Sequence, residues 1–90
     1  MFRLWCKLFD GSNHLIKDTV IQNDDAQLNR TRKIFDSIRE ACYQFDLAEP
    51  IWFESNIETF KRHSKVSFTQ DNFIEHIDFS HMEIQVIEED

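Results

Sequence analysis

Between Asp25 and Phe45, apolar residues recur every three or four positions, which is the period of an amphipathic helix. At about 100° per residue, one side of this helix carries the apolar residues Ile34, Phe35, Ile38, Ala41, Cys42 and Phe45. The opposite side carries Arg32, Lys33, Asp36, Arg39, Glu40 and Tyr43. The spacing therefore predicts one long helix whose apolar side packs against the rest of the chain.

Both ends of this helix have a sequence signal. Asp24 and Gln27 have the spacing of a capping box, so the helix is predicted to begin directly after Asp24. Pro50 disfavours helical dihedrals at the residue before it, so the helix is predicted to end near Asp46 or Leu47.

The N-terminal part alternates with a period of two, as a strand with one buried face does. One side of residues 1–9 carries Phe2, Leu4, Cys6 and Leu8. Residues 14–21 form a second strand-like run, and the chain's single glycine, Gly11, stands between the two runs. A hairpin is expected here, with Gly11 adopting the positive φ.

Shorter elements are predicted after the long helix. Residues 51–53 form either an edge strand or a fixed loop that lays Trp52 against the core. Ser55 and Glu58 have capping-box spacing and predict a short helix ending around His63. Apolar alternation predicts strands around residues 66–69 and 82–86, with one turn opening at residue 71 between them.

The predicted order is β-β-α-β-α-β-β, with the first strand after the long helix uncertain between strand and loop. This order is typical of an α+β fold, in which a small antiparallel sheet packs against one long amphipathic helix plus a short helix. Ninety residues without a repeat or a linker predict a single domain over residues 1–90.

The net charge of -7 is concentrated near the C-terminus. Residues 1–65 contain ten basic and ten acidic residues, whereas residues 66–90 contain no Lys or Arg and seven acids. Direct nucleic-acid binding is not expected, because that affinity comes from clustered Lys and Arg. The partner-binding hypothesis assigns contact with a basic protein to the acids on ordered backbone: Asp71, Glu75, Asp78 and Glu83. The alternative interpretation is a solubilising surface.

Signals for catalysis, cofactors or metals are weak. The chain has no glycine-rich loop, nucleophile elbow or CxxC motif, so no enzyme activity and no cofactor is predicted. His76 and His81 stand five residues apart, which is a poor spacing for a metal site. Cys6 and Cys42 lie on apolar faces and are predicted to be reduced, buried thiols; a disulfide between them is the alternative.

Targeting signals are also missing from the sequence pattern. The N-terminus carries charge within its apolar run and has no small-residue cleavage site, so no signal peptide is expected. No run approaches the roughly 20 apolar residues that a membrane span needs. We therefore predict a cytoplasmic protein without membrane contact, as a monomer or weak homodimer.

Four segments together resemble short bacterial proteins of the Firmicutes type whose function is uncharacterised. These segments are Leu4-Trp5, Pro50-Ile51-Trp52, residues 71–79 (DNFIEHIDF) and Met82-Glu83-Ile84. The resemblance covers most of the chain and implies no function or site residue.

The predicted function is a non-enzymatic acidic interaction module that regulates or inhibits a basic protein partner. One subclass is a mobile-element or phage-type modulator of a nucleic-acid enzyme. One alternative is a small metal-dependent or hydrolytic enzyme that uses His76, His81 and nearby carboxylates. Another is a homo-oligomeric structural protein held together by sheet edges.

Overall fold

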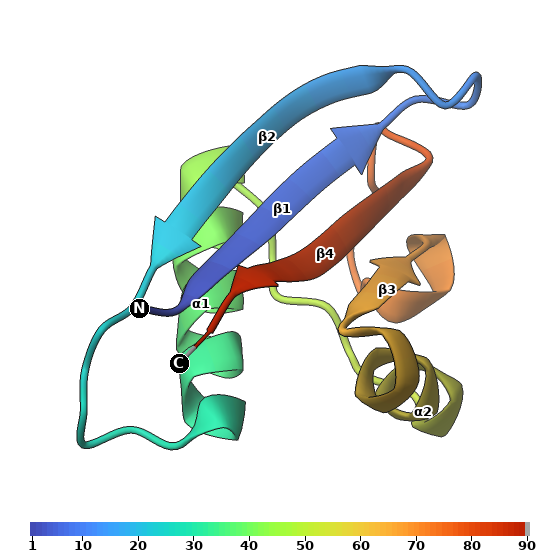
Figure 1. The fold of residues 1–90 in the computed structure, drawn as a ribbon. Helices are drawn as coiled ribbons and strands as arrows, with labels where there is room; N and C mark the ends of the chain where they lie inside the picture. Colours follow the sequence, from blue (N-terminus) through green and yellow to red (C-terminus); the bar gives the residue numbers. More distant parts are fainter. Residues whose placement is uncertain (90) are drawn as a thin grey trace.

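The computed structural model describes residues 1–89, which form a four-stranded antiparallel sheet and two helices (Figure 1). The elements are, in order, β1 (Arg3–Phe9), β2 (Leu15–Gln22), α1 (Arg30–Phe45), α2 (Glu54–His63), β3 (Lys65–Phe68), the 3₁₀ turn η1 (Gln70–Asn72) and β4 (His81–Glu88). The strand order across the sheet is β2-β1-β4-β3. The α+β class is confirmed, and the residue 51–53 segment is a loop and not a strand.

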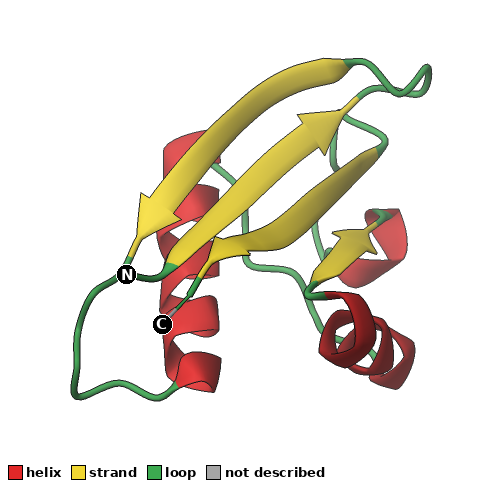
Figure 2. Ribbon diagram, in the orientation of Figure 1, coloured by secondary structure: helices red, strands yellow, loops and turns green. Residues whose placement is uncertain are grey.

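β1 is a central strand that pairs with β2 on one side and β4 on the other. Its predicted alternation is confirmed, because Phe2, Leu4, Cys6 and Leu8 are all buried. Cys6 pairs with Ile84 of β4, and Leu4 pairs with Ile21 of β2, so neighbouring strands add apolar residues to the same face. α1 lies against this face, behind the sheet in Figure 2.

The apolar side of α1 is largely buried, as predicted. Ile34, Ile38, Ala41 and Cys42 lie in the core, whereas Phe35 keeps 41% of its surface exposed. Phe35 lies at the margin of the apolar stripe. Its ring makes an edge contact with the ring of Trp52, with the centroids 5.8 Å apart.

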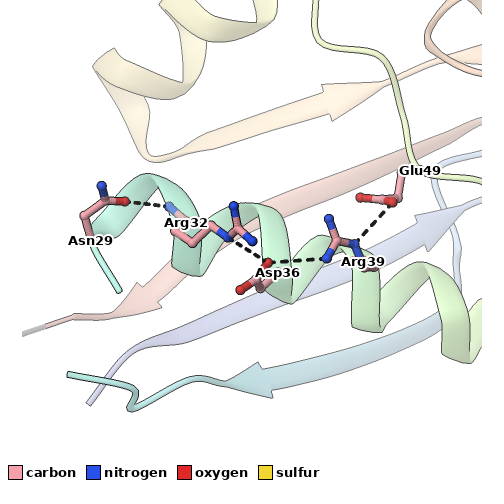
Figure 3. Close-up of polar contacts among 5 residues, drawn as sticks. All are labelled: Asn29, Arg32, Asp36, Arg39 and Glu49. Atoms are coloured by element: carbon pink, nitrogen blue, oxygen red, sulfur yellow. Dashed lines mark hydrogen bonds and ion pairs between the residues drawn. The ribbon is translucent and has the colours of Figure 1, made fainter. Parts of the chain in front are cut away.

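α1 begins later than predicted, because the acids before it are used elsewhere. The N-cap is Asn29, whose side chain accepts the backbone N–H of Arg32 at 2.9 Å (Figure 3). The Asp24 carboxylate instead accepts the backbone N–H of Phe2 at 3.2 Å, and Asp25 caps a local turn. Such local side-chain bonds compete with helix formation.

The C-terminus of α1 lies where Pro50 predicted it. Asp46 adopts the left-handed conformation (φ 58°) and caps the helix through its backbone N–H. A chain of ion pairs follows the exposed side: Asp36 lies 3.5 Å from Arg32 and 3.6 Å from Arg39, which lies 3.5 Å from Glu49 (Figure 3). Asp36, in the middle of α1, is therefore paired with two arginines.

The predicted β1–β2 hairpin is confirmed, but the prediction that Gly11 adopts a positive φ is wrong. Gly11 has no positive φ, and Asn13 takes the left-handed conformation (φ 61°), which asparagine tolerates better than most residues. The Asp10 carboxylate accepts backbone N–H groups from His14 and Ser12 at 2.9 and 2.8 Å, and these bonds lower its pKa. The turn is therefore built around Asp10.

The predicted cap of the short helix is also wrong. α2 begins at Glu54, so Ser55 lies within its first turn. The Asn56 side chain reaches back and accepts the backbone N–H of Phe53 at 2.9 Å. Phe60 is the residue of α2 that enters the core.

The aromatic residues Trp5, Trp52 and Phe53 have different environments. Trp52 packs against the core with edge-on contacts to Phe60 and Phe68 at centroid distances of 5.5 and 5.0 Å. Trp5 lies on the uncovered sheet face, where its indole N–H donates to Asp18 at 2.9 Å. Phe53 is 42% exposed.

Candidate functional site

A cleft of about 420 Å³ lies between the C-terminal end of α1, the loop before β4, and the neighbouring ends of β1 and β2. Its apolar lining consists of Leu8, Ile16, Phe45, Leu47, Ala48, Phe73, Ile77 and Phe79. Asp46, Glu75 and Asp78 supply carboxylates, while Lys17 and His76 are the basic side chains in the lining. We call this feature the acidic cleft.

A buried amide anchors the loop that forms one wall of the acidic cleft. Asn72 is only 3% exposed, and its Nδ2 donates to the Ile51 carbonyl at 2.7 Å and to Asn56 Oδ1 at 2.8 Å. Its Oδ1 accepts the backbone N–H of Thr69 at 3.0 Å. This one side chain therefore joins η1, the loop before α2, and the first turn of α2.

Gln70 holds the next part of the same loop. Its Nε2 donates to the Glu75 carbonyl at 2.9 Å, and its Oε1 accepts the backbone N–H of Ile77 at 2.9 Å. Phe73 and Ile77 fix the loop from the other side, since both are buried in the core. The carboxylates of Glu75 and Asp78 thus project from an anchored backbone.

The predicted acids do not form one surface. Glu75 and Asp78 line the acidic cleft. Asp71 is exposed on η1 but does not line the cleft. Glu83 lies in the middle of β4, opposite Lys7 of β1, on the sheet face that the helices do not cover. The predicted grouping of Glu83 with Asp71, Glu75 and Asp78 is therefore wrong, because the strand register places Glu83 on a different surface.

Glu83 is also neutralised. Lys7 Nζ lies 2.6 Å from Glu83 Oε1, 3.3 Å from Gln85 Oε1 and 3.9 Å from the centre of the Trp5 ring. Only 8% of Lys7 is exposed, so the pair is largely removed from water. This carboxylate is committed to its own chain.

The other described acids of the C-terminal strand region are paired as well. Glu88 lies 3.6 Å from Arg3, and Glu89 lies 2.9 Å from Arg30. In contrast, no Lys or Arg within residues 1–89 pairs with Asp71, Glu75 or Asp78; Asp78 lies 3.4 Å from His76, and both side chains are exposed. Among the acids of residues 66–89, those without a Lys or Arg partner therefore all lie in the loop.

Sequence reasoning missed two residues of this region. Asp46 lines the acidic cleft from the end of α1, and Tyr43, which is 86% exposed, lines a shallow hollow beside it together with Glu75. Both residues are distant from the loop in sequence, so no local pattern indicates that they lie close to Glu75 in space. The available signal was Tyr43 itself, an aromatic residue on the polar side of an amphipathic helix.

His76 and His81, the two histidines of the predicted metal or catalytic alternative, have different surroundings. His81 stacks on Phe9 with centroids 5.0 Å apart and contacts Ser80 Oγ at 3.1 Å. The side chain of His76 is 82% exposed and lies in the loop that forms one wall of the acidic cleft. Across residues 1–89, no group of three or more His, Cys, Asp and Glu side chains has an arrangement that could hold a metal ion.

Both cysteines are free and buried, as predicted. Burial raises the pKa of Cys6 to about 12, with a further contribution from Cys42. Burial, followed by the charge of Glu49, also raises the pKa of Cys42 to about 12. Both groups therefore remain protonated thiols at neutral pH, and thiols are poor nucleophiles.

Comparison with protein-family models, with curated proteins and with solved structures finds no match to this chain. The resemblance to short bacterial proteins thus stays a prediction. Neither helix within residues 1–89 has the length and apolar character needed to cross a membrane.

Proposed function

We propose that this protein is a non-enzymatic interaction module that binds a basic segment of a partner protein in the acidic cleft and thereby regulates or inhibits that partner. The observation that carries the proposal is the contrast in charge pairing. The β4 acids are matched by Lys7, Arg3 and Arg30, whereas Glu75 and Asp78 face the cleft without a Lys or Arg partner among residues 1–89.

The lining of the cleft supports a partner segment with both charge and apolar groups. Carboxylates at the rim attract Lys or Arg side chains, while the apolar lining offers surface for an aliphatic or aromatic anchor. Tyr43 and Ile74, each 86% exposed, are candidate contact residues in the same region. Tyrosine is common among the residues that dominate protein interfaces.

The anchored loop supports affinity in a second way. Gln70 and Asn72 fix the backbone before binding, so less conformational entropy is lost when a partner docks. A cytoplasmic nucleic-acid enzyme of a phage or other mobile element is one partner class that carries the required basic surface. Its DNA-binding face would be the target, because the Lys and Arg side chains that bind DNA phosphates are also complementary to the carboxylates of the acidic cleft.

The test uses two variants with the same change in net charge. Glu75→Lys/Asp78→Lys reverses the cleft acids, and Glu88→Lys/Glu89→Lys reverses two acids at the end of the sheet. Proteins captured from source-cell lysate by the original chain are identified, and their binding to each variant is measured. We expect the cleft variant to weaken binding by about tenfold or more and the control by about twofold or less at low salt. Equal losses would contradict the proposal.

The sheet edge supports a second candidate, a homo-oligomer. β2 forms one edge of the sheet, and Leu15, Ile16 and Val20 on it are 46–49% exposed. Long exposed edge strands can pair with another copy. Sedimentation velocity over a hundredfold concentration range distinguishes the candidates. The Cys6–Thr19 pairing places the backbone N–H of the next residue, Val20, at the open edge, so a Val20→Pro variant should abolish edge pairing but leave partner capture through the acidic cleft intact.

A further inference from the structure

A second hollow lies at the other end of α1. This groove, of about 240 Å³, runs between the first turns of α1 and the body of α2. Its apolar lining is formed by Ile34, Phe35, Trp52, Ile57 and Phe60. We call it the interhelical groove.

The walls of the interhelical groove are apolar side chains left partly in water. Phe35 of α1 and Ile57 of α2 are each 41% exposed, whereas Ile34 and Phe60, which form its floor, are 5% exposed. Trp52 fixes the floor through edge contacts with Phe35 and Phe60 at centroid distances of 5.8 and 5.5 Å. Clustered exposure of large apolar groups around a preformed hollow is typical of a docking surface.

The charge around this groove is opposite in sign to that of the acidic cleft. Arg30 and Lys61 line it, and no Asp or Glu among the described residues does. Arg30 is held in place by Glu89 at 2.9 Å and Ser64 at 3.3 Å, with its guanidinium 5.5 Å from the centre of the Phe60 ring. Lys61 has no ion pair with a described acid, so its ammonium is available to a ligand.

From this combination we propose that the interhelical groove binds an amphipathic helix of a partner, whose aliphatic stripe enters between Phe35 and Ile57 and whose flanking carboxylates meet Lys61. A helix laid in a groove presents apolar anchors at i, i+3, i+4 and i+7, which suits an apolar hollow lined by residues of two helices. The charge complementarity selects acidic flanks, because like charges across an interface are unfavourable. This site is independent of the acidic cleft.

The test uses a synthetic probe and two matched comparison peptides. The probe is a fluorescently labelled 16-residue helix with Leu on one side and Glu on the other. One comparison peptide replaces every Glu with Lys, and the other replaces every Leu with Ser. We expect saturable binding of the Leu/Glu peptide by fluorescence anisotropy, and binding at least about tenfold weaker for both comparison peptides.

Variants of the chain locate the bound peptide. Ile57→Ser and Lys61→Glu should each weaken binding of the Leu/Glu peptide by about fivefold or more. The controls Ile16→Ser and Lys17→Glu make the same two changes on β2, and Glu75→Lys alters the acidic cleft; each should change binding by less than about twofold. Ile57 and Lys61 are exposed, so substituting them should leave the fold intact. Circular dichroism of every variant checks that it does.

The proposal would be overturned by absence of saturable binding, by equal binding of the Leu/Lys peptide, or by equal losses in the β2 controls and the groove variants. If Glu75→Lys lost binding of the Leu/Glu peptide and Lys61→Glu retained it, the peptide would bind near the acidic cleft. That result would also reject the interhelical groove as the binding site.

Discussion

The loop over residues 71–78 and the strand region over residues 83–89 each contain three acids, yet they differ in what surrounds the carboxylates. Pairing with β1 places Glu83 opposite Lys7 and Glu88 opposite Arg3. The loop has no such neighbour, and its acids face solvent or the acidic cleft. Two stretches with similar charge in sequence therefore differ in the charge they present.

The two regions also differ in what holds their backbone. β4 is fixed by strand ladders on both sides, whereas the loop depends on the side chains of Gln70 and Asn72 and on two buried apolar residues. In the strand, charged side chains contribute to the folded structure. In the loop, neutral amides do so, which leaves the charges unpaired.

The largest effect is expected at Asn72, which supports the loop. Asn72→Ala removes three hydrogen bonds. It takes the side-chain partner from the Thr69 N–H and the Ile51 carbonyl, while Asn56 Oδ1 keeps the N–H of Phe53, so the free energy of unfolding should fall by ~2–4 kcal/mol. Urea denaturation measures the loss.

Asn23→Ala is the matched control, because that side chain makes one local bond to Asp25. Similar losses in both variants would show that the loop does not depend on the Asn72 network.

The next effect is expected in the strand region. Glu83→Ala leaves the buried ammonium of Lys7 with Gln85 and the Trp5 ring but without an opposite charge. We expect a loss of ~2–3 kcal/mol, below the full cost of breaking a buried pair because the Glu83 side chain is 20% exposed. The control Glu88→Ala breaks a half-exposed pair and should cost about 0.5 kcal/mol or less.

A double variant sharpens this result. Lys7→Met/Glu83→Met removes both charges, so it should recover most of the stability lost in Glu83→Ala. Failure to recover would show that packing of the Glu83 side chain, and not the unpaired charge, causes the loss.

A smaller effect is expected at Gln70. Gln70→Ala removes two bonds of 2.9 Å in a part-exposed site, so the cost should be ~1–2 kcal/mol. Because Gln70 accepts the amide N–H of Ile77, hydrogen exchange at Ile77 should accelerate by about tenfold while exchange in β1 changes less. Uniform acceleration across the chain would indicate global destabilisation and contradict a local role.

The smallest effect on stability is expected for the loop acids themselves. Asp71→Asn, Glu75→Gln and Asp78→Asn should each change the free energy of unfolding by about 0.5 kcal/mol or less, because these side chains make no ion pair with Lys or Arg in residues 1–89. Thermal denaturation at low and high salt measures this. A loss above about 1 kcal/mol would show that the loop acids, like those of β4, support the fold.

Local patterns determined much of the architecture. Period-two alternation predicted the buried side of β1, and the helical stripe predicted Ile34, Ile38 and Cys42 in the core, because burial of an apolar face leaves a periodic record in sequence. Pro50 marked the end of α1 through its effect on neighbouring dihedrals. Each signal acts over only a few residues.

The sites depended on tertiary structure. Strand pairing placed Glu83 against Lys7, 76 residues away in sequence, and the fold brought Asp46 to the same cleft as Glu75. The mistaken cap at Asp24 has the same origin, since its carboxylate binds the backbone of Phe2, which only the folded chain brings near. Charge and capping potential are properties of a residue, but the partner that uses them is chosen by contacts between distant segments.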